Sequence, residues 1–146
     1  MNSEYHKGRG AQINPKNKFS SHEFVNDHIE GIDEDAGINH RRKVYFENPR
    51  NILSKNKSPD IPFTYSINPY QGCEHGCVYC YARNAHTHWG FSAGMDWETK
   101  IIAKNNAPEL LERAFLKKSW IPETIVLSGN TDPYQPLEKK LLISRV

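Results

Sequence analysis

Three cysteines near the middle of the chain carry its clearest chemical signal. They are Cys73, Cys77 and Cys80, in the run Cys-Glu-His-Gly-Cys-Val-Tyr-Cys, and the 146-residue chain contains three cysteines in all. An odd number of cysteines crowded into one segment is a poor framework for disulfide bonds. The pattern instead indicates reduced thiolates that bind a metal.

The cysteine spacing indicates what kind of segment holds them. In a regular helix the outer two sulfurs would be strung along about 10 Å of the axis, too far apart for one compact metal centre. The segment is therefore expected to be a loop that wraps around the metal. Gly72 and Gly76 give its backbone the freedom to do so.

Two kinds of metal centre fit three convergent thiolates. A structural zinc site needs four protein ligands, so His75, His86 or His88 would have to supply the fourth. A cubane iron–sulfur cluster held by three cysteines leaves one iron without a protein ligand, and that iron is free for chemistry. Zinc sites usually begin with a C-x2-C pair, whereas the first pair here is spaced by three residues. The spacing therefore favours the cluster, with zinc as the alternative.

The surrounding sequence predicts the elements that position this loop. Residues 63–68 (Phe-Thr-Tyr-Ser-Ile-Asn) alternate apolar and polar side chains, as a strand does, and Pro69 and Gly72 end the pattern. Residues 124–127 (Thr-Ile-Val-Leu) predict a buried parallel strand, and residues 107–118 between the two runs predict a helix. The order strand, helix, strand is typical of an α/β fold.

Further short elements are expected elsewhere. Asn106 is the expected N-cap of the helix over residues 107–118, and a second helix is expected after Pro136, with Leu137, Leu141 and Leu142 on one face. The remaining expectations are short strands at 44–46 and 100–104, a helix at 78–85 and a connection at 86–97.

A second loop also follows a predicted strand. It covers residues 128–136 and begins Ser-Gly-Asn-Thr-Asp, and the carboxyl ends of parallel strands are where α/β folds bind ligands. Gly129, Asn130, Thr131 and Asp132 are therefore candidate ligand contacts. The alternative is an ordinary turn, because Gly, Asn, Asp and Pro are common turn residues.

The cysteine run resembles a known motif. Cys73, Cys77 and Cys80, with Tyr79 just before the last cysteine, are similar to the CxxxCx(aromatic)C motif of the radical S-adenosylmethionine (SAM) superfamily. The wider runs 65–83 and 128–136 resemble the branch related to spore photoproduct lyase and labelled DNA-repair-photolyase-like. Residues 8–11 (Gly-Arg-Gly-Ala) and 47–50 (Glu-Asn-Pro-Arg) also resemble that branch.

The resemblance implies the N-terminal portion of a partial (βα)6 TIM-like barrel in which each cysteine binds one iron of a [4Fe–4S] cluster. SAM would bind the fourth iron through its amino and carboxylate groups, with Tyr79 against the adenine. Residues 129–132 stand where the superfamily often carries a Gly-Gly-Glu stretch that receives the SAM amino group. The implied reaction is reductive cleavage of SAM to a 5′-deoxyadenosyl radical that acts on an unknown substrate, with an electron donor such as flavodoxin or ferredoxin.

Composition and charge bear on the domain organisation, the binding partners and the cellular location of the protein. Apolar residues concentrate after residue 60, so we expect an extended or disordered arm over residues 1–42 and the domain over residues 43–146. The stretches Glu30–Asp35 and His40–Lys43 are interpreted as solvated surface. A net charge of +2 does not support nucleic-acid binding. No run is long and apolar enough for a membrane span, and the first residues do not resemble a signal peptide, so a cytoplasmic location is expected.

The end of the sequence suggests an N-terminal portion of a larger protein. Two parallel strands cannot cover both of their faces, and the last predicted helix is amphipathic and still running when the sequence stops. One alternative is therefore an inactive fragment of a radical SAM enzyme, and another is a zinc-stabilised binding module. We expect the chain alone to be poorly stable and to turn SAM over slowly or not at all.

Overall fold

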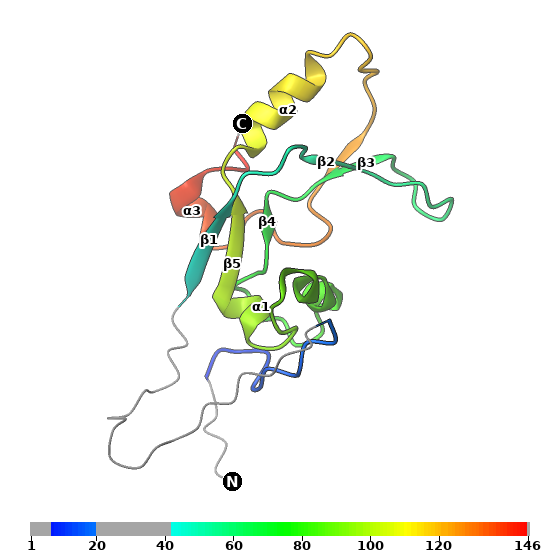
Figure 1. Ribbon diagram of the computed structural model, residues 1–146. Helices are drawn as coiled ribbons and strands as arrows, with labels where there is room; N and C mark the ends of the chain where they lie inside the picture. Colours follow the sequence, from blue (N-terminus) through cyan, green and yellow to red (C-terminus); the bar gives the residue numbers. More distant parts are fainter. Residues whose placement is uncertain (1–6, 20–41, 146) are drawn as a thin grey trace, which may run out of the picture.

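The computed structural model describes residues 7–19 and 42–145, and they build two small mixed sheets flanked by short helices (Figure 1). The expected solvated stretch at residues 30–35 and most of the predicted N-terminal arm lie outside these ranges. In the described part of the chain the strands form two separate sheets and no closed barrel. The partial (βα)6 barrel therefore stays a prediction.

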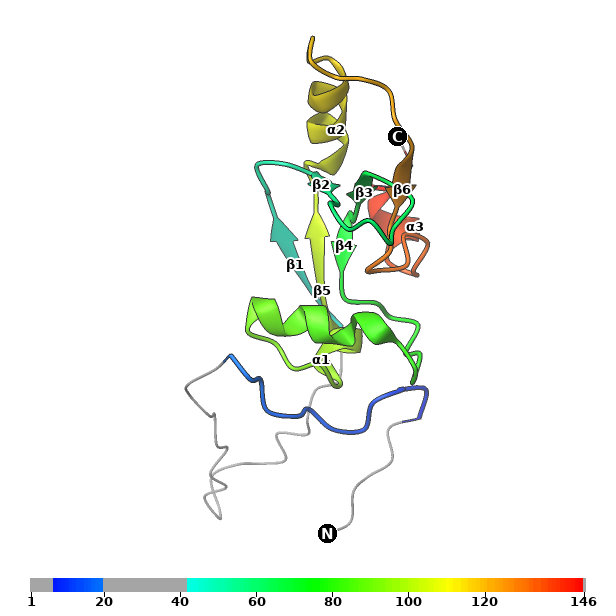
Figure 2. The ribbon, with the colours of Figure 1, turned by 90° about the vertical axis from the view of Figure 1, so that its right-hand side faces the viewer.

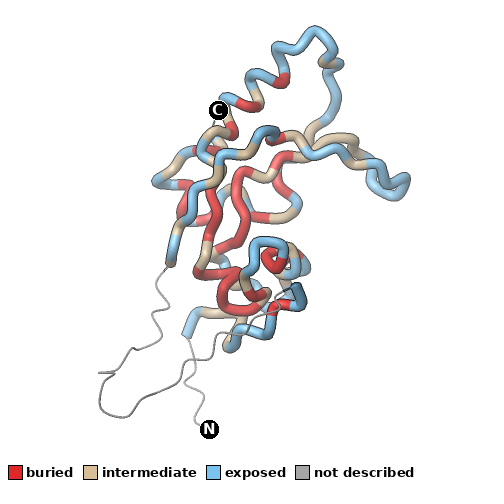
Figure 3. The backbone as a smooth tube through the Cα atoms, in the orientation of Figure 1, coloured by how far each residue is buried: buried red, intermediate tan, exposed pale blue. Residues whose placement is uncertain are grey.

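The first sheet has the strand order β1, β5, β4. Strands β1 (Lys43–Glu47) and β5 (Lys100–Lys104) are parallel, and β4 (Tyr70–Gln71) is antiparallel to β5. The middle of the central strand β5 is buried: Ile101, Ile102 and Ala103 are almost entirely enclosed (Figure 3). The expected strands at 44–46 and 100–104 are thus confirmed.

The second sheet contains the two strands of the predicted strand–helix–strand unit. Strand β3 (Tyr65–Ile67) lies between β2 (Leu53–Lys55), which is antiparallel to it, and β6 (Ile125–Leu127), which is parallel to it. The parallel pairing is confirmed. The expected burial of β6 is wrong, because β6 is an edge strand and Leu127 is 42% exposed.

The helices follow the predicted segments with shifted bounds. They are the 3₁₀ helix η1 (Tyr81–Trp89), α1 (Asp96–Thr99), α2 (Ala107–Phe115) and α3 (Glu138–Leu141). The helix predicted at 78–85 lies at 81–89, and the segment predicted as a connection at 86–97 therefore holds the end of η1 and the start of α1. Helix α2 ends three residues earlier than predicted.

The helix ends follow the prediction in part. Asn106 is the N-cap residue of α2, as expected, but its side chain makes no capping hydrogen bond and its amide donates instead to the carbonyl of Pro49, 3.1 Å away. Leu142 is 47% exposed and has a positive φ of 53°, so it ends α3 instead of joining its buried face. Leu137 is buried and Leu141 packs against the same core, as expected.

Two apolar cores hold these elements together. The larger one joins both sheets with α2 and the C-terminal segment, and its buried members are Ile52, Ile67, Tyr70, Ile101, Ala103, Ala107, Leu110, Leu137 and Ile143. The smaller one consists of Cys73, Ala82 and Trp97, with Cys80 partly buried against it. The cysteine loop is therefore built over a core of its own.

The N-terminal segment 7–19 contains no helix or strand, and it runs across η1 and α1 (Figure 2). Asn14 makes two hydrogen bonds of 2.9 Å with Asp96, and the amide of Asn17 donates to the carbonyls of Thr87 and Phe91. This part of the predicted arm is thus packed against the domain. No helix in the described ranges is long and apolar enough to cross a membrane.

Candidate functional site

The three cysteines border one cavity of about 300 Å³, and the second candidate loop borders it too. The structure thus gathers seven of the eight predicted site residues around one space, although residues 73–80 and 129–132 are far apart in the sequence. The cavity is lined by Cys73, His75, Cys77, Cys80, Tyr81, Ala82, Trp97, Gly129, Asn130, Thr131 and Asp132.

The eighth predicted residue, Tyr79, is not among the residues that line the cavity. Its side chain is 86% exposed. Tyr81, two residues further on, lines the cavity instead, and its hydroxyl donates a hydrogen bond to the carbonyl of Gly129. The sequence offers only the alternation Tyr-Cys-Tyr to suggest Tyr81, so its role was missed. The structure therefore connects the two loops through Tyr81.

The cysteine loop turns tightly because two glycines adopt backbone angles that other residues rarely adopt. Gly72 has φ of 84° and Gly76 has φ of 64°, as expected for a loop that wraps. At Gly72 a Cβ would lie 2.9 Å from the carbonyl oxygen of Lys100 and 3.0 Å from that of Trp97. The amide of Cys73 donates to the same Trp97 carbonyl at 3.0 Å. The loop therefore starts directly on the end of α1.

The three thiols are free, and they differ in exposure. Cys73 is buried, Cys80 is partly buried and Cys77 is exposed. Burial raises the pKa of the Cys73 thiol, and hydrogen bonds with the backbone of His75 and Asp132 oppose that rise. A thiol must lose its proton to bind a metal. We therefore expect Cys73 to bind a metal less readily at low pH.

Hydrogen bonds fix the second loop to the cysteine segment. The Thr131 hydroxyl donates to the carbonyl of Tyr70 at 2.9 Å, and the Asn130 amide donates to the Gln71 side chain at 2.6 Å. Further along, the amide of Leu137 donates to the Glu74 carboxylate at 2.8 Å. The side chains of Asn130 and Thr131 therefore hold the loop in place.

Asp132 is the charged member of residues 129–132, and it lines the cavity. Its carboxylate lies 3.1 Å from Nε2 of His75, and both side chains are about half exposed. An exposed pair of this kind contributes little to stability. Asp132 is thus the member of residues 129–132 best placed to meet a cationic group of a ligand.

The three histidines that sequence reasoning offered as zinc ligands lie in different places. His75 lines the cavity, whereas His86 is fully buried between the rings of Phe91 and Trp97, and His88 stacks on Phe19. His86 and His88 are not among the residues that line the cavity. A zinc site built on the three cysteines would therefore have to use His75.

Within residues 7–19 and 42–145, no three histidine, cysteine or acidic side chains lie close enough together to hold a single metal ion. A cluster makes a different demand, because each thiolate binds its own iron atom. For a cluster the three cysteines need to border one common space, and they do so here. The donor set and the cavity therefore fit a cysteine-bound cluster.

The known proteins that this chain resembles in sequence are named as uncharacterized proteins. An uncharacterized protein of Mycobacterium tuberculosis is 42% identical over 86 residues, which are 57% of this chain and 25% of that protein. An uncharacterized protein of Methanocaldococcus jannaschii is 32% identical over 81 residues, which are 56% of this chain and 28% of that protein. The chain thus spans about a quarter of the length of these relatives. No family model and no solved structure matches it.

Proposed function

We propose that this chain forms the cysteine loop and the facing wall of a radical SAM site. Cys73, Cys77 and Cys80 would bind three irons of a [4Fe–4S] cluster, and the fourth iron would take SAM. The observation that carries the proposal is the single cavity that joins the three free cysteines to residues 129–132. A cluster held there, once reduced by an external one-electron donor such as flavodoxin or ferredoxin, would supply the electron that cleaves SAM to methionine and a 5′-deoxyadenosyl radical.

The residues around the cavity have complementary roles in this proposal. Trp97 and Ala82 form an apolar wall behind Cys73 and keep water from that side. Cys77 and Cys80 close the more exposed side. Across the cavity, the Asp132 carboxylate can attract the SAM ammonium group, since opposite charges attract at a partly shielded rim.

Anaerobic reconstitution with iron and sulfide tests the proposal. We expect a brown protein with about four irons and four sulfides per chain, and we expect Cys73→Ser, Cys77→Ser and Cys80→Ser each to lose most of that iron. His75→Ala is the matched comparison, because it removes a cavity-lining group that a cluster does not require. SAM added to the reduced cluster should change its electron paramagnetic resonance spectrum.

The zinc alternative predicts different results in the same experiment. A colourless protein that holds one zinc per chain, and that releases this zinc in the His75→Ala variant, would refute the cluster. It would show a complete shell of four protein ligands instead.

A further inference from the structure

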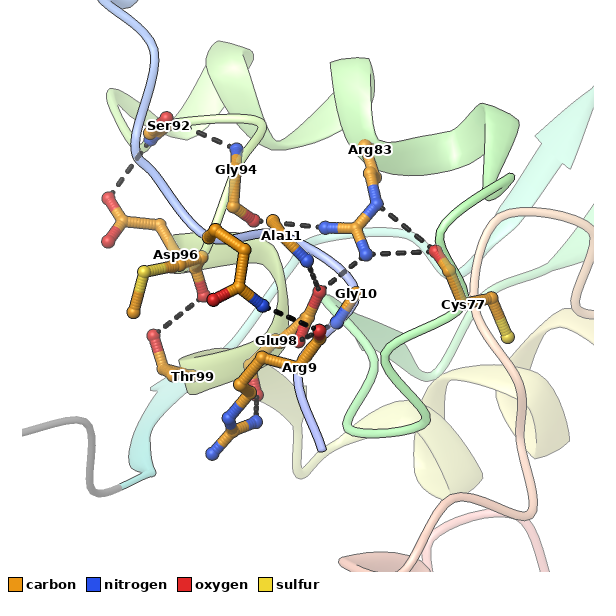
Figure 4. A network of polar contacts seen from close by, with 12 residues as sticks. Arg9, Gly10, Ala11, Cys77, Arg83, Ser92, Gly94, Asp96, Glu98 and Thr99 are labelled. Carbon is orange, nitrogen blue, oxygen red and sulfur yellow. Dashed lines mark hydrogen bonds and ion pairs between the residues drawn. The ribbon is translucent and has the colours of Figure 1, made fainter. Parts of the chain in front are cut away.

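A buried carboxylate lies directly beneath the cysteine loop. Glu98, in α1, is 0% exposed, and its two oxygens accept hydrogen bonds from two parts of the chain, the N-terminal segment and η1 (Figure 4). The backbone amide of Gly10 donates to Oε2 at 3.2 Å, and that of Ala11 donates to Oε1 at 3.0 Å. Arg83 donates to Oε1 at 2.5 Å through Nη2. Glu98 therefore ties the N-terminal segment to η1.

Arg83 extends this network to a candidate metal ligand. Its Nη2 and Nε atoms donate to the carbonyl oxygen of Cys77 at 2.9 and 3.3 Å, and its Nη1 donates to the carbonyl of Gly94 at 3.1 Å (Figure 4). The planar guanidinium has donors in a fixed fork, so it holds its acceptors in one mutual geometry. The backbone of Cys77 is thus held relative to Glu98.

The N-terminal segment also touches the cysteine loop directly. A Cβ on Gly10 would lie 2.0 Å from the carbonyl oxygen of Gly76 and 2.9 Å from Nη2 of Arg83. The residue before Cys77 and the segment at Gly10 are therefore in backbone contact. Nothing larger than glycine fits at position 10 without moving one of them.

We propose that residues 10–11, Glu98 and Arg83 form a bracket that sets the position of Cys77, with Arg83 as the positioning residue. The metal part of this inference rests on the proposed function, whereas the bracket itself does not. The N-terminal segment is then a structural component of the site. It acts on Cys77 through Glu98 and Arg83, and through the contact between Gly10 and Gly76.

The bracket can be tested on the metal-free, reduced chain by amide hydrogen exchange over residues 72–80. We expect exchange about tenfold faster in Arg83→Gln, because a hydrogen bond donated by a charged group contributes a factor of this size. Arg83→Lys should recover part of the protection. Gly10→Ala keeps every charge and should also speed exchange, so it tests the contact even if Arg83→Gln fails to fold. Arg113→Gln, at an exposed site on α2, is the matched control.

A second test measures the midpoint potential of the cluster in the reconstituted chain. A loss of packing alone would not change this potential. Reduction adds negative charge to a cluster, so the nearby Arg83 cation should raise the midpoint potential. We therefore expect a more negative potential in Arg83→Gln, and a potential close to that of the unaltered chain in Arg83→Lys and Arg113→Gln. Equal potentials in the unaltered chain and Arg83→Gln would overturn the positioning role.

The two proposals can fail separately. If the unaltered chain assembles no cluster, the proposed function fails, and the exchange experiment still decides the bracket. If Arg83→Gln and Gly10→Ala both leave exchange over residues 72–80 unchanged, the bracket is refuted whatever the metal content.

Discussion

Acidification is expected to destabilise the chain through one buried imidazole. His86 is fully enclosed between the rings of Phe91 and Trp97, with centroids 5.1 and 5.4 Å away. Burial lowers its pKa from 6.5 to about 4, and the Asp96 carboxylate opposes that fall. The native state therefore holds His86 neutral at pH values where the unfolded chain would already be protonated.

The sign and size of the effect follow from that difference in pKa. Between pH 6.5 and about 4 the unfolded state binds more protons at His86 than the native state does. The free energy of unfolding is therefore highest above pH 6.5, and it decreases as the pH falls toward 4. At about 1.4 kcal/mol for each tenfold step in proton affinity, the gap corresponds to about 3 kcal/mol. A loss of this size is a large fraction of the stability of a small domain.

His86→Phe isolates the contribution of this imidazole. Phenylalanine keeps an aromatic ring between Phe91 and Trp97 but does not titrate. Urea unfolding at pH 7 and pH 4 should therefore show a smaller acid loss in His86→Phe, by about 3 kcal/mol. His88→Phe is the matched control, because His88 is exposed and its replacement leaves His86 in place. Equal acid losses in His86→Phe and the unaltered chain, or an imidazole resonance of His86 that titrates near 6.5, would refute the reasoning.

Three further predictions concern the cavity walls and the sheet edge, each measured by urea unfolding. Trp97→Ala should cost about 3–5 kcal/mol, because it empties the small core under Cys73; a loss below about 1 kcal/mol would contradict this. Thr131→Val should cost about 1 kcal/mol, since it removes the hydrogen bond to Tyr70, and an unchanged or higher stability would count against that bond. Leu127→Thr should change stability by less than about 0.5 kcal/mol, because β6 is a half-exposed edge strand; a larger loss would mean that this edge is covered.

Strands and helices with a clear sequence period were found without the structure. The alternation at residues 63–68 and the apolar runs at 100–104 and 124–127 each correspond to a strand, and residues 107–115 form the expected helix. The two-residue strand β4 was missed, because two residues carry no period and Pro69 and Gly72 on either side suggest a turn. Its formation depends on pairing with β5, which lies some thirty residues further along the chain.

The candidate site was only partly predictable. The cysteine spacing identified the loop, and the strand–turn pattern identified residues 129–132, which the structure brings to the same cavity. Glu98 carried no such signal, because a charged residue in a short polar stretch is normally solvated. Its partners are at positions 10, 11 and 83, and only the folded chain brings them together.

The contact between residues 10 and 98 also sets an order of assembly. During synthesis the segment 7–19 leaves the ribosome before its partners Asp96 and Glu98, which follow more than eighty residues later. Closing so long a stretch costs chain entropy before any contact forms, so this segment is expected to dock after η1 and α1 are in place. A chain that begins at β1 would leave the Glu98 carboxylate without the amides of Gly10 and Ala11, and Gly76 without its contact at Gly10.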